Sequence, residues 1–171
     1  MRGGFVPKTR EVVCAAIIAA LYAVFTVALA PLSYGPLQFR IAEILKGLVI
    51  WYPVTIPGIV LGTIIANLTS PYVGAWELVW MPITDGLGGV LTWMIARALG
   101  HRIGPWLAVL CYALTTGAAV GLMLSFVAGV PFWFVFASVA FSESVIIVGG
   151  LPIMRYIARM WNVRVSSPRD N

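Results

Sequence analysis

Long apolar stretches, separated by short polar interruptions, run along most of the chain. Six of them are predicted to be membrane-spanning helices, at about residues 11–30, 39–51, 56–68, 76–99, 106–127 and 132–159. A helix needs about 20 residues to cross the hydrocarbon core of a bilayer. The second and third stretches are shorter, so we expect them to be tilted, broken by proline or shielded by their neighbours. The interruptions at 31–38, 69–75, 100–105 and 128–131 each contain proline or glycine and are predicted to be loops or turns.

The composition supports an integral membrane protein. Of the 171 residues, 61% are hydrophobic and 10% are charged, whereas soluble domains average about 25% charged residues. A soluble chain of this length could not hide so much apolar surface in one core. The prediction is therefore an all-α, compact six-transmembrane-helix bundle, with residues 1–171 as a single domain and a polar cytoplasmic tail at about 160–171.

The basic residues predict the topology, because short cytoplasmic loops are enriched in lysine and arginine. With the N-terminus inside, the cytoplasmic side receives nine of the eleven basic residues. They are Arg2, Lys8, Arg10, Arg97, Arg102, Arg155, Arg159, Arg164 and Arg169. Arg40 falls on the outer side and Lys46 lies within the second segment. Both termini are thus expected to be cytoplasmic, which requires an even number of spans.

Polar side chains from four segments are expected to meet in the outer half of the bundle. They are Glu43, Asn67, Glu77, Asp85 and Glu143. Polar groups at such depth face the protein interior rather than lipid, so their convergence predicts a cavity that opens outward. The alternative is plain structural pairing, since Arg40, Glu43 and Lys46 are spaced three apart and such neighbours meet on a helix. Against it, four carboxylates face only two cations.

The aromatic residues near the outer edge are mostly expected to form an interfacial belt. Tyr34 and Trp133 lie next to predicted loops and are candidates for stacking on a flat ligand. Signals for catalysis are missing: the chain has no GxxxxGK[ST] loop, no zinc spacing, and its one histidine, His101, lies in a predicted turn. The expectation is a protein that is not an enzyme and itself binds no cofactor or metal.

Four segments resemble a known family of membrane proteins. They read PLSYGPLQFRIAE at 31–43, IPGIVLGTIIANL at 56–68, GVPFW at 129–133 and FSESV at 141–145. Together they resemble the QueT family, the substrate-binding (S) components of energy-coupling factor (ECF) transporters proposed to import queuosine precursors. The resemblance implies a six-helix S component in a prokaryotic plasma membrane. It would capture a 7-deazaguanine base outside and dock on a transmembrane coupling subunit (EcfT) with two ATPases that use the ATP.

The resemblance also implies roles for individual residues. Glu143 or Asp85 would bind the base edge, Glu43 or Glu77 an amine, and Arg40 or Gln38 the carbonyl oxygen, with loop 31–38 as a gate. In this superfamily an AxxxA face on the first helix contacts the coupling subunit. Two parallel stripes match that pattern, and both stay open: Ala15, Ala19 and Ala23, or Ala16 and Ala20.

Two departures from the family pattern keep other substrates and functions open. The fifth segment has no acid in GLMLSF at 121–126, where the family often carries one, and Asp85 follows Glu77 as an extra acid. The alternatives are an S component for another small vitamin or nucleobase, or a stand-alone secondary transporter. The latter would need an internal repeat or a coupling-ion site, and the sequence shows neither clearly.

Overall fold

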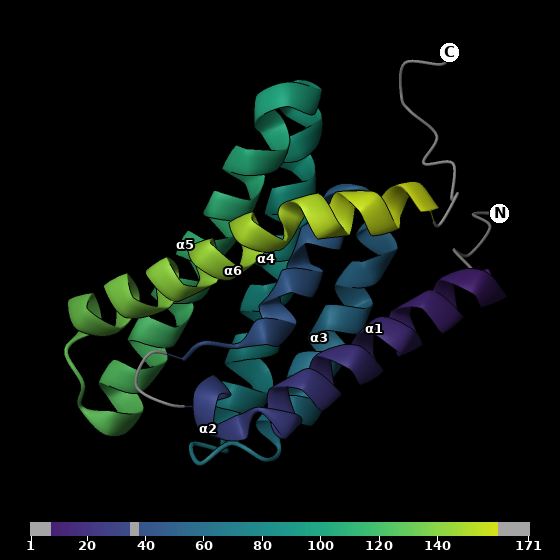
Figure 1. The fold of residues 1–171 in the computed structure, drawn as a ribbon. Coiled ribbons are helices and arrows are strands. Elements are labelled where there is room, and N and C mark those ends of the chain that lie inside the picture. Colours follow the sequence, from purple (N-terminus) through teal and green to yellow (C-terminus); the bar gives the residue numbers. More distant parts are fainter. Residues whose placement is uncertain (1–7, 35–37, 161–171) are drawn as a thin grey trace, which may run out of the picture.

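The computed structural model describes residues 8–34 and 38–160, and all regular secondary structure in this part of the chain is helical (Figure 1). The elements are α1 (Thr9–Ala28), α2 (Ala30–Ser33), η1 (Ile41–Ile50), η2 (Pro53–Thr55), α3 (Ile56–Asn67), η3 (Trp76–Trp80), α4 (Met81–Ala98), α5 (Gly100–Ala128) and α6 (Phe132–Met160). The predicted all-α class is confirmed. The predicted tail at about 160–171 lies almost wholly outside the described residues.

Four helices are long and apolar enough to cross a membrane. They are Thr9–Ala28, Trp76–Ala98, Gly100–Ala128 and Phe132–Met160. The apolar helix Pro53–Asn67 is shorter, and so is η1 with ten residues. These two correspond to the predicted third and second segments, so the number of crossings and the topology stay predictions.

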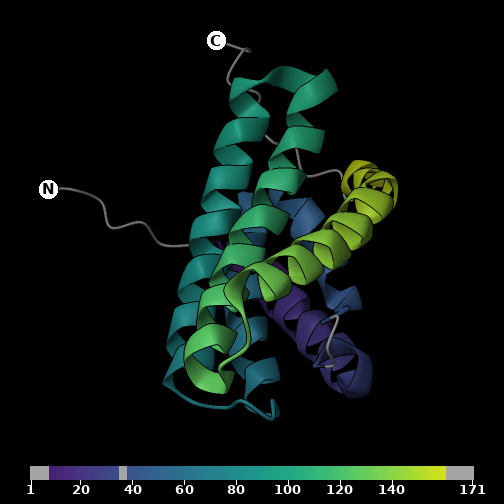
Figure 2. The same ribbon diagram turned by 90° about the vertical axis from the view of Figure 1, so that its left-hand side faces the viewer.

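The predicted interruption at 100–105 is wrong, because α5 already begins at Gly100. A single residue, Leu99, separates α4 from α5, and Gly100 adopts a φ of +75°, which residues with a side chain rarely take. Gly104 then lies against α4, where an added Cβ would be 2.8 Å from the Ala96 carbonyl oxygen. The turn therefore folds the chain back tightly, and α4 and α5 run side by side (Figure 2). The predicted loop at 31–38 also differs, since it contains α2; residues 35–37 lie outside the described residues.

The helices form two groups with η1 packed against both. On one side α5 packs against α4 and α6, and on the other α1 packs against α3 (Figures 1 and 2). Close contact between α1 and α3 depends on two glycines of α3. A Cβ on Gly58 would lie 2.5 Å from the Ala15 carbonyl oxygen, and one on Gly62 would lie 2.8 Å from Tyr22 Cβ. Small residues at this spacing let two helix backbones approach in a membrane.

The element η1 is an unusual centre for such a bundle, because it is a 3₁₀ helix of ten residues. Such helices rarely exceed three or four residues. Eight of its ten residues are buried. Its apolar residues Leu45, Leu48 and Val49 join one core with Tyr22 of α1 and Tyr112 of α5.

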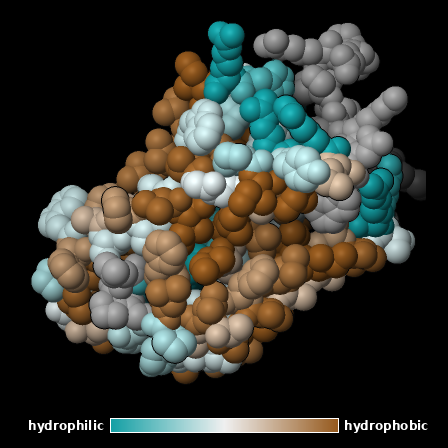
Figure 3. Space-filling view, viewed as in Figure 1, coloured by the Kyte–Doolittle hydropathy of each residue, from teal (hydrophilic) through white to brown (hydrophobic). Residues whose placement is uncertain are grey.

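The surface matches a membrane environment. The face in Figure 3 is largely hydrophobic, and hydrophilic residues gather toward the end where α1 begins and α6 ends. Large apolar side chains are exposed on every long helix, for example Val24 on α1, Leu87 on α4, Leu114 on α5 and Phe141 on α6. A lipid-facing surface accounts for this exposure, since a soluble monomer rarely exposes large contiguous apolar patches.

Candidate functional site

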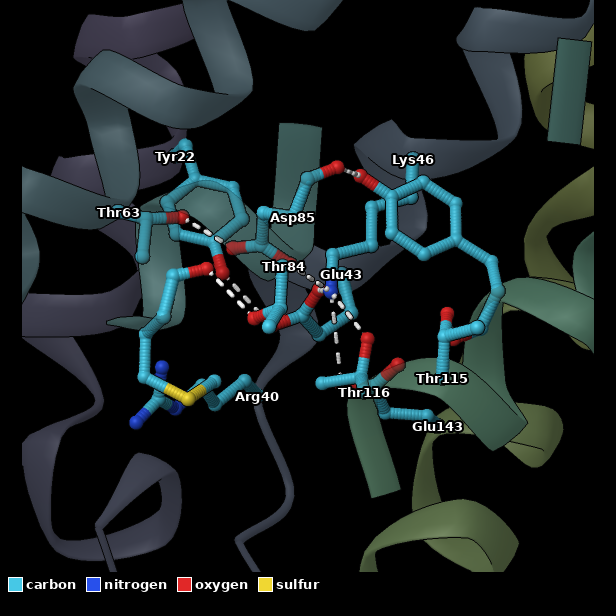
Figure 4. A network of polar contacts seen from close by, with 12 residues as sticks. Tyr22, Arg40, Glu43, Lys46, Thr63, Thr84, Asp85, Thr115, Thr116 and Glu143 are labelled. Atoms are coloured by element: carbon cyan, nitrogen blue, oxygen red, sulfur yellow. Dashed lines mark hydrogen bonds and ion pairs between the residues drawn. The ribbon is translucent and has the colours of Figure 1, made fainter. Parts of the chain in front are cut away.

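The centre of the site is the ammonium group of Lys46, which is fully buried. Its Nζ lies 2.6 Å from Glu43 Oε2, 2.9 Å from Asp85 Oδ1 and 3.5 Å from Glu143 Oε1. It also donates to Thr116 Oγ1 at 3.1 Å. Figure 4 shows these side chains pointing toward the lysine from η1, α4, α5 and α6. One ammonium thus ties together four elements of the fold.

The geometry of η1 explains why this lysine meets Glu43. A 3₁₀ helix has three residues per turn, so side chains three apart are eclipsed along its axis. Glu43 and Lys46 follow this spacing within η1, whereas Arg40 immediately precedes η1 with an extended backbone. Glu43 and Lys46 therefore lie one above the other on η1. Of the two structural pairings considered from the sequence, Glu43 with Lys46 is present.

Buried hydroxyl groups hold the carboxylates in place. Tyr22 of α1 donates to Glu43 Oε1 at 2.6 Å, and Thr63 of α3 donates to Asp85 Oδ2 at 2.6 Å. The Tyr112 hydroxyl donates to the Asp85 main-chain oxygen at 2.7 Å, while its ring lies 4.6 Å from the lysine nitrogen. Hydrogen bonds to ionised groups are stronger than neutral ones, so the contacts from α1 and α3 fix the two acids, and Tyr112 of α5 fixes the main chain at Asp85.

Arg40 belongs to a second polar group next to the first. Its Nε donates to the Ser33 main-chain oxygen at 3.3 Å and its NH1 to Asn67 Oδ1 at 3.5 Å. Its guanidinium lies 5.1 Å from the centre of the Tyr34 ring. The Asn67 amide in turn donates to the main-chain oxygen of Glu77 at 2.9 Å. Arg40 is thus engaged mainly with the ends of α2 and α3.

Glu77 lies on η3, a single π-helical turn at the start of α4. Its side chain is buried, and neither carboxylate oxygen has a hydrogen-bond partner among the described residues, although Ser70 lies close by. Glu143 Oε2 is likewise buried without a hydrogen-bond partner in this part of the chain. The free oxygen of Glu143 can therefore accept a hydrogen bond from a ligand, and π-helical turns such as η3 occur frequently at functional sites.

A small cavity lies against the lysine cluster. It has a volume of about 10 Å³, which is room for about one water molecule. Its lining residues are Gln38, Arg40, Glu43, Met81, Asp85, Thr116, Val120, Val139 and Glu143. Gln38 has a φ of +46°, a conformation uncommon for residues other than glycine. Such strain tends to cluster at ligand sites.

The structure brings some of the predicted site residues together and separates others. Glu43, Asp85 and Glu143 meet at Lys46, while Arg40, Asn67, Glu77 and Tyr34 form the adjacent group. Gln38 lines the cavity. Trp133 is 74% exposed and contacts the rings of Phe132 and Phe136, so it does not reach the cluster.

Sequence reasoning did not select Lys46 as a site residue, nor the hydroxyl donors Tyr22, Thr63 and Thr116. A lysine inside an apolar segment is a usable signal, since charged residues there are commonly functional. The hydroxyl groups carry no such signal, because threonine and tyrosine are tolerated at many membrane positions. Only the packing of four elements shows what they contact.

The structure distinguishes the two alanine stripes of α1. Ala19 and Ala23 are buried and Ala15 is half-buried, with Gly58 and Gly62 of α3 against that side of the helix. Ala16 and Ala20 are exposed. The first stripe therefore serves packing within the bundle, and the second lies on the free surface of α1.

Comparisons with known proteins relate the chain to transporters. The chain is 38% identical over 65 residues to the queuosine precursor transporter QueT of Lactococcus lactis subsp. cremoris (strain MG1363). That alignment covers 37% of this chain and 38% of the relative. No solved structure gives a significant match. The family model described as QueT transporter matches residues 12–159, which include α2 to α5 and nearly all of α1 and α6. The buried acids of this membrane chain converge on a small internal cavity, and the family model matches the chain along almost its whole length. The chain therefore belongs to the QueT transporter family.

Proposed function

We propose that this protein is the S component of an ECF-type ABC importer that captures a queuosine precursor. It would lie in a prokaryotic plasma membrane as a multi-pass protein with six spans and both termini in the cytoplasm. The family match supports transport, and the relative from Lactococcus carries the name of a queuosine precursor transporter. The site would be reached from the outer side, where the asymmetry of basic residues places η3 and the start of α6.

The observation that carries the proposal is the excess of buried acid around the cavity. Glu43, Asp85 and Glu143 share a single ammonium, so the cluster has a formal charge of −2 when all four groups are ionised. Uncompensated charge is costly to bury, and a ligand with a cationic arm would reduce that cost. A 7-deazaguanine base with an aminomethyl arm fits, because it offers adjacent N–H donors to one carboxylate and an ammonium to another.

The free hydrogen-bond acceptors suggest how the roles divide. Glu143 has one oxygen near Lys46 and the other without a partner, and it lines the cavity. We assign it to the N–H edge of the base. Gln38 and Arg40 line the same cavity and can donate to the carbonyl oxygen. Since the cavity holds only about one water, binding a base requires the surrounding side chains to move apart.

The test is a titration of the purified protein with 7-aminomethyl-7-deazaguanine, in which binding is measured by calorimetry. Glu143→Gln and Asp85→Asn keep the side-chain shape and remove the charge. Loss of a charge-assisted hydrogen bond costs about 1.5–3 kcal/mol, so each variant should bind about 10- to 150-fold more weakly. The control is Glu11→Gln at the start of α1, which should bind normally. Unchanged affinity in both site variants would refute the site.

The same titration separates the substrate alternatives. If the wild-type protein ignores the deazaguanine but binds guanine or another small vitamin tightly, the S-component assignment can stand with a different substrate. Uptake by liposomes that contain only this chain would instead favour a stand-alone secondary transporter.

The exposed alanine stripe of α1 is the proposed surface for the coupling subunit EcfT, which would carry two ATPases. Ala16 and Ala20 leave a smooth strip on a helix that is otherwise lined by exposed Val24 and Phe25. Ala20→Leu should leave the protein folded and able to bind ligand but should abolish co-purification of the coupling complex. Ala19→Leu is the matched contrast, because its side chain is buried, and it should reduce thermal stability. Retention of the complex by Ala20→Leu would refute this surface.

A further inference from the structure

The position of Lys46, at the centre of the acid cluster and beside the cavity, points to more than a structural role. Its ammonium is buried at the point where acids from η1, α4 and α6 converge, next to the cavity. Oxygen atoms of the three carboxylates and of Thr116 all lie within 3.5 Å of its nitrogen. The ammonium of Lys46 therefore lies at the place that the ammonium group of a ligand would need in order to contact all three carboxylates.

Arg40, the other nearby cation, does not take the place of Lys46 among the carboxylates. Arg40 directs its hydrogen bonds to the Ser33 main chain and to Asn67. In the part of the chain that the structure describes, Lys46 makes every ion pair of Glu43, Asp85 and Glu143. A ligand ammonium that uses these carboxylates must consequently share or take over the place of Lys46, because the cavity beside it holds only about one water.

We propose that Lys46 is a specificity-determining residue, an internal counter-ion that holds the three carboxylates at the place where the cationic group of the ligand binds. This inference deepens the proposed function and rests on it. When no ligand is bound, the lysine offsets part of the repulsion among the acids. When an amine-bearing ligand enters, its ammonium competes with the lysine, so Lys46 reduces affinity for cationic ligands and keeps the site from binding any small cation tightly.

Competition of this kind predicts a particular pattern of affinities. The probes are 7-aminomethyl-7-deazaguanine and 7-deazaguanine without the arm, which differ by one cationic group. Replacing Lys46 by methionine keeps an unbranched side chain and removes the charge. We expect Lys46→Met to raise the ratio of the two affinities, amine over neutral base, by at least tenfold relative to wild type. Lys46→Arg retains the charge and should leave the ratio within a few-fold of wild type.

An unchanged ratio of the two affinities in folded Lys46→Met would overturn the inference. If both affinities also stay at the wild-type level, the lysine has only a structural role. If both fall by the same factor, the lysine contacts the shared base rather than competing with the amine.

A double variant keeps the test decisive if Lys46→Met does not fold. Lys46→Met with Glu43→Gln removes one charge of each sign, so the cluster keeps its formal charge of −2 without an internal ammonium. It should still favour the amine-bearing probe more strongly than wild type does, and an unchanged ratio would again refute the idea. If wild-type protein binds neither probe, the proposed function fails and this inference falls with it. If wild type binds the probes but replacing Lys46 leaves the ratio of the two affinities unchanged, this inference alone fails.

Discussion

The hydrogen bond from Thr63 to Asp85 offers a quantitative test of how tightly the acid cluster is fixed. Thr63 Oγ1 is buried on α3 and donates to Asp85 Oδ2 at 2.6 Å, while the other oxygen of Asp85 pairs with Lys46. Thr63→Val keeps the branched shape and removes the donor. The carboxylate oxygen is then buried without a partner, and hydrogen bonds to charged groups contribute about 1.5–3 kcal/mol.

A second threonine provides the matched control. Thr84 lies one residue from Asp85, and its hydroxyl donates to the Met81 main-chain oxygen at 2.8 Å, within its own helix. Thr84→Val removes a hydroxyl without leaving a charged group unpaired, so its cost should stay within about 0.5 kcal/mol. The comparison isolates the contact with the carboxylate from the general effect of replacing threonine by valine in a membrane helix.

The assay is thermal unfolding of the three proteins in one detergent, followed by tryptophan fluorescence. For a chain of this size about 1 kcal/mol shifts Tm by about 2–4 °C, so Thr63→Val should unfold roughly 3–12 °C below wild type and Thr84→Val within about 2 °C of it. Ligand affinity should fall in Thr63→Val as well, because Asp85 loses one of its two anchors. Equal Tm values for the two variants would refute the view that Thr63 fixes a charged acid.

Two further substitutions test the packing of α1 against α3 and the hydrogen bond from Tyr22 to Glu43. Gly58→Ala should destabilise the protein by about 1–3 kcal/mol, because its Cβ would lie 2.5 Å from the Ala15 carbonyl oxygen. Gly149→Ala is the control, since nothing lies within 4 Å of that position, and it should be neutral or stabilising in the same melting assay. Tyr22→Phe removes the donor to Glu43 at 2.6 Å and should weaken binding of the amine-bearing probe about tenfold. Tyr156→Phe on the exposed side of α6 should bind normally, and equal affinities of the two tyrosine variants would contradict the role of Tyr22.

The sequence predicted the parts of this fold that depend on hydropathy alone. The apolar runs gave both ends of α3 and α6, and the C-terminal end of α4, to within one residue. The start of α5 was missed because GHRIGP contains two glycines and a proline, which usually indicate a longer turn. A single glycine with positive φ suffices to reverse the chain here, and its neighbours continue the helix.

The site was predictable only in outline. Acids deep in apolar segments must face the interior, and that argument alone selected Glu43, Asp85 and Glu143. It could not say that they meet at one ammonium, since the contacts join η1, α4 and α6, and Lys46 and Glu143 are 97 positions apart in the sequence. The alanine stripes of α1 show the same limit. Their spacing is identical, and only the glycines of α3 show which stripe packs inside the bundle.

The 3₁₀ geometry of η1 links its length to the alignment of its charges. At 2.0 Å per residue its ten residues extend about 20 Å, whereas the same residues as an α-helix would extend about 15 Å. The α-helical form would also rotate Lys46 about 60° away from Glu43 around the helix axis, because successive residues turn by about 100° instead of 120°. A change of this one segment between the two geometries would therefore move its ends by about 5 Å and shift the angle at which Glu43 and Lys46 meet.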